Sequence, residues 1–153
     1  MTTPYPDDNG PRWVPRTLGG TVYVVVVGMN TLGRRLVEGF MERGDLVLAV
    51  DTDQRKLAAL PCPTLLGNTD HPDVLEEAGI PRARLVVSAL QIEDANGLLA
   101  YRVARLGVLV SVHAFDPALA DELRELGASH LMISKYDGIR QVAEALRREG
   151  VMA

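Results

Sequence analysis

The sequence has little cysteine and no long apolar run. Its one cysteine, Cys62, cannot form a disulfide within the chain of 153 residues, which favours a reducing compartment. The longest apolar run, Val22 to Val27, is far shorter than the roughly 20 residues that cross a bilayer. No basic start followed by an apolar segment marks a secretory signal. These absences predict a cytoplasmic protein that does not insert directly into the membrane.

An excess of positive charge is also lacking. The sequence contains 16 Lys and Arg residues and 20 Asp and Glu residues, so the formal net charge is −4. Binding to a nucleic-acid backbone or an anionic membrane surface needs a basic footprint, and we therefore expect no nucleic-acid partner. The three histidines, His71, His113 and His130, share no spacing typical of metal ligands, so no metal site is predicted. Cys62 stands between two prolines with no base nearby, and we expect it to be inert.

Prolines and glycines are concentrated in the first 20 residues, which predicts a flexible leader without helix or strand. From residue 21 to 149 the chain is the size of one ordinary domain. Short apolar runs alternate there with helical patterns, several of which end at a glycine. The expected strands are Thr21–Val27, Leu46–Val50, Thr64–Leu66, Leu85–Ala89, Leu109–Ala114 and Leu131–Ile133. The expected helices are Leu32–Arg43, Gln54–Leu60, Pro72–Ala78, Ile92–Leu106, Pro117–Leu126 and Tyr136–Arg148.

Strands that are apolar on both faces and joined by helices predict an α/β fold. The expectation is a single Rossmann-like, doubly wound domain. Its six-stranded sheet would be mainly parallel, with helices on both faces. Ligands of such folds bind at the carboxyl ends of the strands, where the strand order reverses.

A glycine turn occupies that place, directly after the first strand. It consists of Gly28, Met29, Asn30, Thr31, Leu32 and Gly33. Gly28 permits a tight turn, Gly33 permits close packing of the helix on the strand, and the N–H groups at the helix start form an anion site. The turn is nearly the dinucleotide fingerprint G-x-G-x-x-G, but Asn30 replaces its second glycine.

Two further segments indicate an adenosine site. Asp51 ends the second strand about 20 residues beyond the glycine turn, where an acid accepts hydrogen bonds from ribose hydroxyls. Helix capping together with Asp53 is the alternative role for Asp51. The third strand runs into Gly67, Asn68 and Thr69, where the amide of Asn68 can pair with an adenine edge or serve an ordinary turn.

The order of these blocks resembles the TrkA-N, or RCK N-terminal, family. The resemblance rests on GMNTLGRRL, LVLAVDTDQRKLAAL, LLGNTDHPDVLEEAGI, ARLVVSALQIEDAN and LGASHLMIS, and it covers residues 21 to 149. It implies a non-catalytic regulatory domain of a potassium channel, an uptake system or a cation/proton antiporter. It also implies an adenine nucleotide ligand: NAD, NADH, AMP, ADP or ATP.

The resemblance also assigns roles to residues. The glycine turn would hold the phosphates and Asp51 the ribose, with Thr52 beside it. Asp53, Gly67, Asn68 and Thr69 would serve the adenosine end. The crevice wall after the fourth strand would be Ser88, Ala89 and Leu90, and Asp94 and Asn96 would position the next helix.

The resemblance further implies partners. The expected partner is an integral-membrane cation channel or antiporter on a separate chain, which would hold the domain at the inner face of the membrane. A homodimer is also expected, because the family dimerises through its later helices. The helix predicted at Tyr136–Arg148 carries an apolar stripe for this purpose, although the stripe could instead pack on its own sheet.

Three residues depart from the family pattern: Asn30, Asn68 in place of an aspartate, and His113 where an arginine is common. The Asn30 side chain could crowd a pyrophosphate or contact a phosphate itself, so a mononucleotide such as AMP is also an expected ligand.

The sequence also leaves two alternative functions open. One is an NAD-dependent oxidoreductase, for which the sequence supplies no recognisable catalytic set. The other is a Rossmann scaffold that serves assembly alone.

Overall fold

The structure, a computed structural model, describes residues 23–114, 117–133, 143–144, 146–148 and 150. The expected leader and most of the helix expected at Tyr136–Arg148 lie outside these residues. The strands are β1 (Tyr23–Val27), β2 (Leu46–Asp51), β3 (Thr64–Leu66), β4 (Leu85–Ser88), β5 (Leu109–Ala114) and β6 (His130–Ile133). The helices are α1 (Thr31–Glu42), α2 (Gln54–Leu57), α3 (Pro72–Glu77), α4 (Glu93–Arg105) and α5 (Ala120–Leu126).

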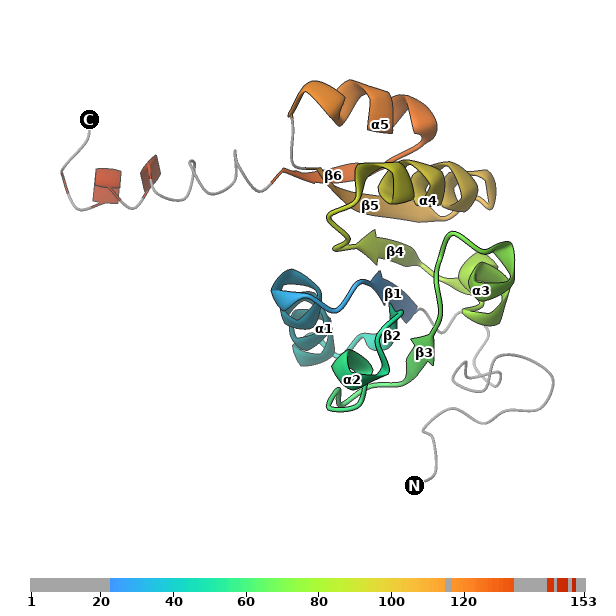
Figure 1. The fold of residues 1–153 in the computed structure, drawn as a ribbon. Coiled ribbons are helices and arrows are strands. Elements are labelled where there is room, and N and C mark those ends of the chain that lie inside the picture. The colour runs from blue at the N-terminus through green and yellow to red at the C-terminus, as the bar shows by residue number, and fades with distance from the viewer. Residues whose placement is uncertain (1–22, 115–116, 134–142, 145, 149, 151–153) are drawn as a thin grey trace.

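The strands form one parallel sheet in the order β3-β2-β1-β4-β5-β6 (Figure 1). The chain therefore builds one half of the sheet outward from β1 and then returns to build the other half from β4. The strand order reverses between β1 and β4. This is the doubly wound arrangement that the sequence predicts, with all strand pairs parallel.

Helices cover both faces of the sheet because alternate residues of each buried strand point to opposite faces. On β1, Val24 and Val26 pack with residues of α1 and α2, whereas Val25 and Val27 pack with residues of α3, α4 and α5. All five residues of β1 are buried. A strand that is apolar on both faces thus produces two cores.

Some element bounds differ from the expected ones. The helix expected to reach Leu60 ends at Leu57, and Pro61 disfavours helical backbone at the residue before it. Short 3₁₀ turns occur at Ile80–Arg82, where none is expected, and at Pro117–Leu119 before α5. The first of them follows Gly79, whose φ of +69° ends α3.

Hydrogen bonds continue beyond the strand ends and bring three turns to one edge of the sheet. The Gly28 N–H donates to the Val50 carbonyl, the Ala89 N–H to the Val27 carbonyl and the Gly67 N–H to the Asp51 carbonyl. The turns after β1, β3 and β4 therefore meet at the carboxyl end of the sheet.

Cys62 provides a simple test of packing on the α1 and α2 side. The residue contacts that core, and burial raises the pKa of its thiol to about 11. At pH 8 we expect iodoacetamide to alkylate the folded protein roughly a hundredfold more slowly than the urea-unfolded chain, because only the thiolate reacts. Mass spectrometry over time measures both rates, and equal rates would contradict this packing.

Candidate functional site

The glycine turn joins β1 tightly to α1. Gly28 has a φ of +90°, which favours glycine. A Cβ atom on Gly33 would stand 1.7 Å from the Gly28 carbonyl oxygen, so α1 approaches the turn as closely as a glycine allows. The structure thus gives Gly28 the turn role and Gly33 the packing role that the sequence predicts.

Asn30 caps α1 in an ordinary backbone conformation, with φ −73° and ψ −174°. Its Oδ1 accepts from the Gly33 N–H at 2.9 Å, and its Nδ2 donates to the Ala89 carbonyl at 2.7 Å. Position 30 therefore does not need glycine for its backbone angles, and both ends of the amide have protein partners. The N–H groups of Thr31 and Leu32 are the remaining donors of the first helical turn.

Asp51 ties the end of β2 to the glycine turn. Its Oδ2 accepts from the Met29 N–H and its Oδ1 from the Asp53 N–H, both at 2.7 Å. Each carboxylate oxygen retains a second lone pair that can accept from a sugar hydroxyl. Capping of α2 belongs to Asp53, whose carboxylate accepts from the Arg55 N–H at 2.9 Å. This N–H lowers the pKa of Asp53.

A crevice of about 220 Å³ opens at this edge of the sheet. Its lining residues are Val27, Gly28, Asp51, Thr52, Gly67, Asn68, Thr69, Asp70, Leu90, Ile92 and Ala95. The structure therefore brings together seven of the predicted residues, from the turns after β1, β2, β3 and β4. The predicted residues outside the lining are Met29, Asn30, Thr31, Leu32, Gly33, Asp53, Ser88 and Ala89.

Sequence reasoning missed the wall that the start of α4 provides. Ile92 and Ala95 line the crevice opposite the polar turn after β3, and 62% of Ile92 is exposed. The sequence signal for this wall is an apolar residue, Ile92, directly before the polar start of a helix. Asp70 was also missed, and its main-chain carbonyl accepts from the Arg102 guanidinium.

Asn96 fixes α4 to the sheet from a fully buried position. Its Oδ1 accepts from the Ser88 hydroxyl at 2.6 Å, and its Nδ2 donates to the carbonyls of Leu90 and His113, both at 2.8 Å. The Leu90 N–H lies 3.2 Å from the Ser88 hydroxyl oxygen. Ser88 and Asn96 thus position the crevice wall, as expected for Asn96, while Asp94 is exposed.

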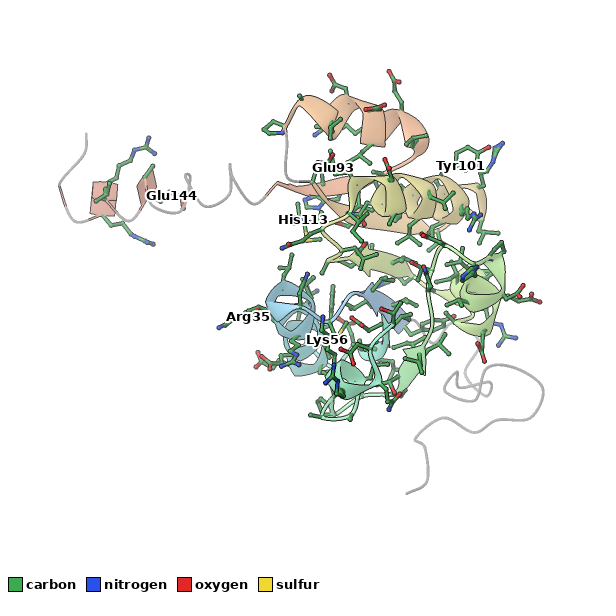
Figure 2. All side chains as sticks on the ribbon, in the orientation of Figure 1. Arg35, Lys56, Glu93, Tyr101, His113 and Glu144 are labelled. Carbon is green, nitrogen blue, oxygen red and sulfur yellow. The ribbon has the colours of Figure 1, made fainter. Side chains whose placement is uncertain are left out.

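His113 lies within the sheet on β5, whereas Arg35 and Lys56 are exposed on α1 and α2 (Figure 2). Burial lowers the pKa of His113 and favours the neutral imidazole at pH 7. His113 does not line the crevice.

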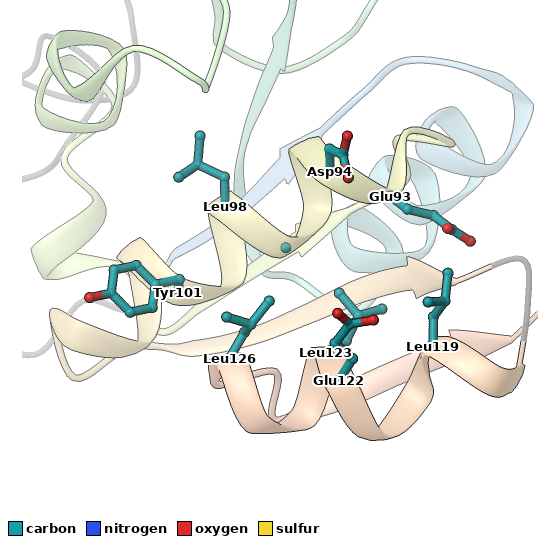
Figure 3. Close-up of a pocket in the computed structure, with 9 residues that line it drawn as sticks. Glu93, Asp94, Leu98, Tyr101, Leu119, Glu122, Leu123 and Leu126 are labelled. Atoms are coloured by element: carbon teal, nitrogen blue, oxygen red, sulfur yellow. The ribbon is translucent and has the colours of Figure 1, made fainter.

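A larger hollow of about 480 Å³ lies between α4 and α5. Its floor is apolar, with Leu98, Leu119, Leu123 and Leu126. Glu93 and Tyr101 stand at opposite ends, and Glu122 lies beside Leu123, between Leu119 and Leu126 (Figure 3). The carboxylates of Glu93, Asp94 and Glu122 disfavour an anionic ligand in this hollow.

The part of the chain that the structure describes contains no group of three His, Cys, Asp or Glu side chains placed to hold a metal ion. No helix within it has the length and apolarity to span a bilayer.

Three solved structures resemble the fold at low sequence identity. The TrkA-N domain of inner membrane protein ybaL from Escherichia coli has a TM-score of 0.78 and 15% identity, with 84% of this chain and 99% of that chain covered. The Kef C-terminal domain of Shewanella denitrificans, in its AMP-bound form, has a TM-score of 0.73 and 20% identity, with 84% and 81% covered.

The GsuK channel bound to NAD has a TM-score of 0.68 and 18% identity. The match covers 78% of this chain but only 22% of the channel chain. No curated protein sequence matches the chain.

The model of the TrkA-N domain family matches residues 24–134, which is most of the chain and nearly all of its sheet. This match confirms the resemblance seen in the sequence. The chain belongs to the TrkA-N domain family.

Proposed function

We propose that the chain is a non-catalytic regulatory domain that binds an adenine nucleotide in the crevice at the carboxyl end of the sheet. The observation that carries the proposal is the joining of Asp51 to the glycine turn through the Met29 N–H. This bond places a carboxylate beside a helix start, so that one site offers acceptors for a ribose and donors for a phosphate.

The chemistry of the crevice agrees with an adenosine ligand. Leu90, Ile92 and Ala95 provide an apolar wall for a base, and Asn68 and Thr69 provide polar groups on the facing turn. Asp51 and the donors of Thr31 and Leu32 then serve the sugar and the phosphate. Solved structures of the same fold, with AMP on a Kef domain and NAD or ADP on GsuK, support this class of ligand.

The proposed partner is an integral-membrane cation channel or antiporter on a separate chain, because the similar domains include parts of the GsuK channel and of Kef. In this role the domain is held at the inner face of the membrane and acts as a homodimer. The ligand state of the crevice is then passed to the transporter.

Thermal shift with AMP, ADP, ATP, NAD and NADH tests the nucleotide site. A ligand at 100 times its Kd stabilises the folded state by about 2.7 kcal/mol. This raises Tm by roughly 5–10 °C for a domain of this size. We expect Ala95→Phe, which fills the crevice, to abolish the shift, and Ala58→Phe, at the exposed position directly after α2, to retain it.

No stabilisation by any of the five nucleotides at millimolar concentration would refute the nucleotide site. A scaffold that serves assembly alone would then explain the fold. Turnover of NADH with a simple carbonyl would instead favour the oxidoreductase.

A further inference from the structure

The Asn30 side chain spans the gap between the start of α1 and the end of β4. Its Oδ1 is 2.9 Å from the Gly33 nitrogen and its Nδ2 is 2.7 Å from the Ala89 carbonyl oxygen. These partners lie on the two sides of the point where the strand order reverses, because Gly33 follows β1 and Ala89 follows β4. The amide therefore closes a bridge across that point.

A dinucleotide on a doubly wound sheet must cross the same point. Its adenosine lies on the β1 and β2 side, and its second nucleoside lies beyond β1. The polar lining of the crevice, with Asp51, Asn68 and Thr69, is on the β2 and β3 side. Its volume of about 220 Å³ is below the roughly 300–1,000 Å³ that is usual for a whole ligand pocket. The crevice thus holds one nucleoside and leaves the other half of a dinucleotide to cross at Asn30.

Asn30 also uses one of the main-chain donors at the start of α1. The first four N–H groups of a helix lack partners within it, and here they belong to Asn30, Thr31, Leu32 and Gly33. Asn30 itself occupies the Gly33 donor. The N–H groups of Asn30, Thr31 and Leu32 remain as donors for a phosphate group.

We propose that Asn30 is a specificity-determining residue that restricts the crevice to adenine mononucleotides such as AMP. Its bridge to Ala89 fills the path of a second nucleoside, and its cap on Gly33 removes the donor that a second phosphate would use. This inference rests on the proposed function of the crevice.

Calorimetry with AMP and NAD on the wild-type protein, Asn30→Gly and Asn30→Ser tests the inference. We expect the wild type to bind AMP at least about tenfold more tightly than NAD. Asn30→Gly removes both the cap and the bridge. Serine retains the cap on the Gly33 N–H but is too short to reach the Ala89 carbonyl. Asn30→Ser therefore removes the bridge alone. Both variants should gain NAD affinity by about tenfold or more and keep AMP affinity within about threefold.

The outcomes separate this inference from the function on which it rests. The role of Asn30 would be overturned if the wild type bound AMP and NAD with equal affinity. It would also be overturned if the ratio of AMP affinity to NAD affinity were unchanged in both variants. In either case the nucleotide site itself would stand. A gain of NAD affinity in Asn30→Gly but not in Asn30→Ser would overturn the bridge as the barrier. Failure of AMP and NAD to bind any of the three proteins would overturn the specificity and the site together.

Discussion

Gly33→Ala is expected to lower the free energy of unfolding by about 3 kcal/mol, because the new methyl group overlaps main-chain atoms. Its Cβ atom would stand 1.7 Å from the Gly28 carbonyl oxygen and 2.9 Å from the Gly28 carbonyl carbon. Neither atom belongs to a flexible side chain, so relief requires α1 to move away from β1. For a domain of this size the loss corresponds to a Tm decrease of roughly 6–12 °C.

Gly39→Ala on the same helix is the matched control. A Cβ atom on Gly39 meets nothing within 4 Å, so the alanine gains helix propensity without a clash. We expect it to raise the free energy of unfolding by about 0.5–1 kcal/mol. Urea unfolding curves measure both variants. Equal stabilities of the two variants would show that α1 does not pack on the glycine turn as described.

Asn96→Leu is expected to lower the free energy of unfolding by about 3 kcal/mol or more, because it removes three hydrogen bonds that the buried Asn96 amide makes. Leucine keeps the branching and the number of side-chain heavy atoms of asparagine but has no polar atom. The carbonyls of Leu90 and His113 and the hydroxyl of Ser88 each lose a hydrogen bond to the Asn96 amide. The loss also loosens the start of α4, so nucleotide affinity should fall together with stability.

Asn68→Ala serves as the control for the loss of an amide. The Asn68 side chain accepts from the Asp70 N–H in an exposed turn, and its removal should cost less than about 1 kcal/mol. Adding Ser88→Ala to Asn96→Leu should cost less than the sum of the two single changes, because the residues share a hydrogen bond. A fully additive double variant would contradict this network.

The fold could be predicted from the sequence because its main signals are local. Runs such as Val24–Val27 are apolar on both faces, and helices that stop at Gly44, Gly79 or Gly107 separate the strands. Both signals depend only on neighbouring residues. The 3₁₀ turn at Ile80–Arg82 was missed because a helix stop at Gly79 and a proline at position 81 also fit an extended connection.

The candidate site was predicted less completely because its decisive contacts join distant residues. The bond from Asn30 to Ala89 spans 59 positions, and the bond from Met29 to Asp51 spans 22. The spacing from the glycine turn placed Asp51 at a strand end. It could not show that the Asp51 carboxylate already accepts hydrogen bonds from the main-chain N–H groups of Met29 and Asp53. The capping role that competes with ribose binding at Asp51 falls instead to Asp53.

The first turn of α4 is a wall shared by the crevice and the larger hollow. Ile92 and Ala95 face the crevice, while Glu93 and Asp94 face the hollow. Asn96 fastens this turn to β4 and β5. A molecule that displaces the turn from one side thereby reshapes the other side. If ligands bound on both sides, thermodynamic reciprocity would require each to alter the affinity of the other by the same factor.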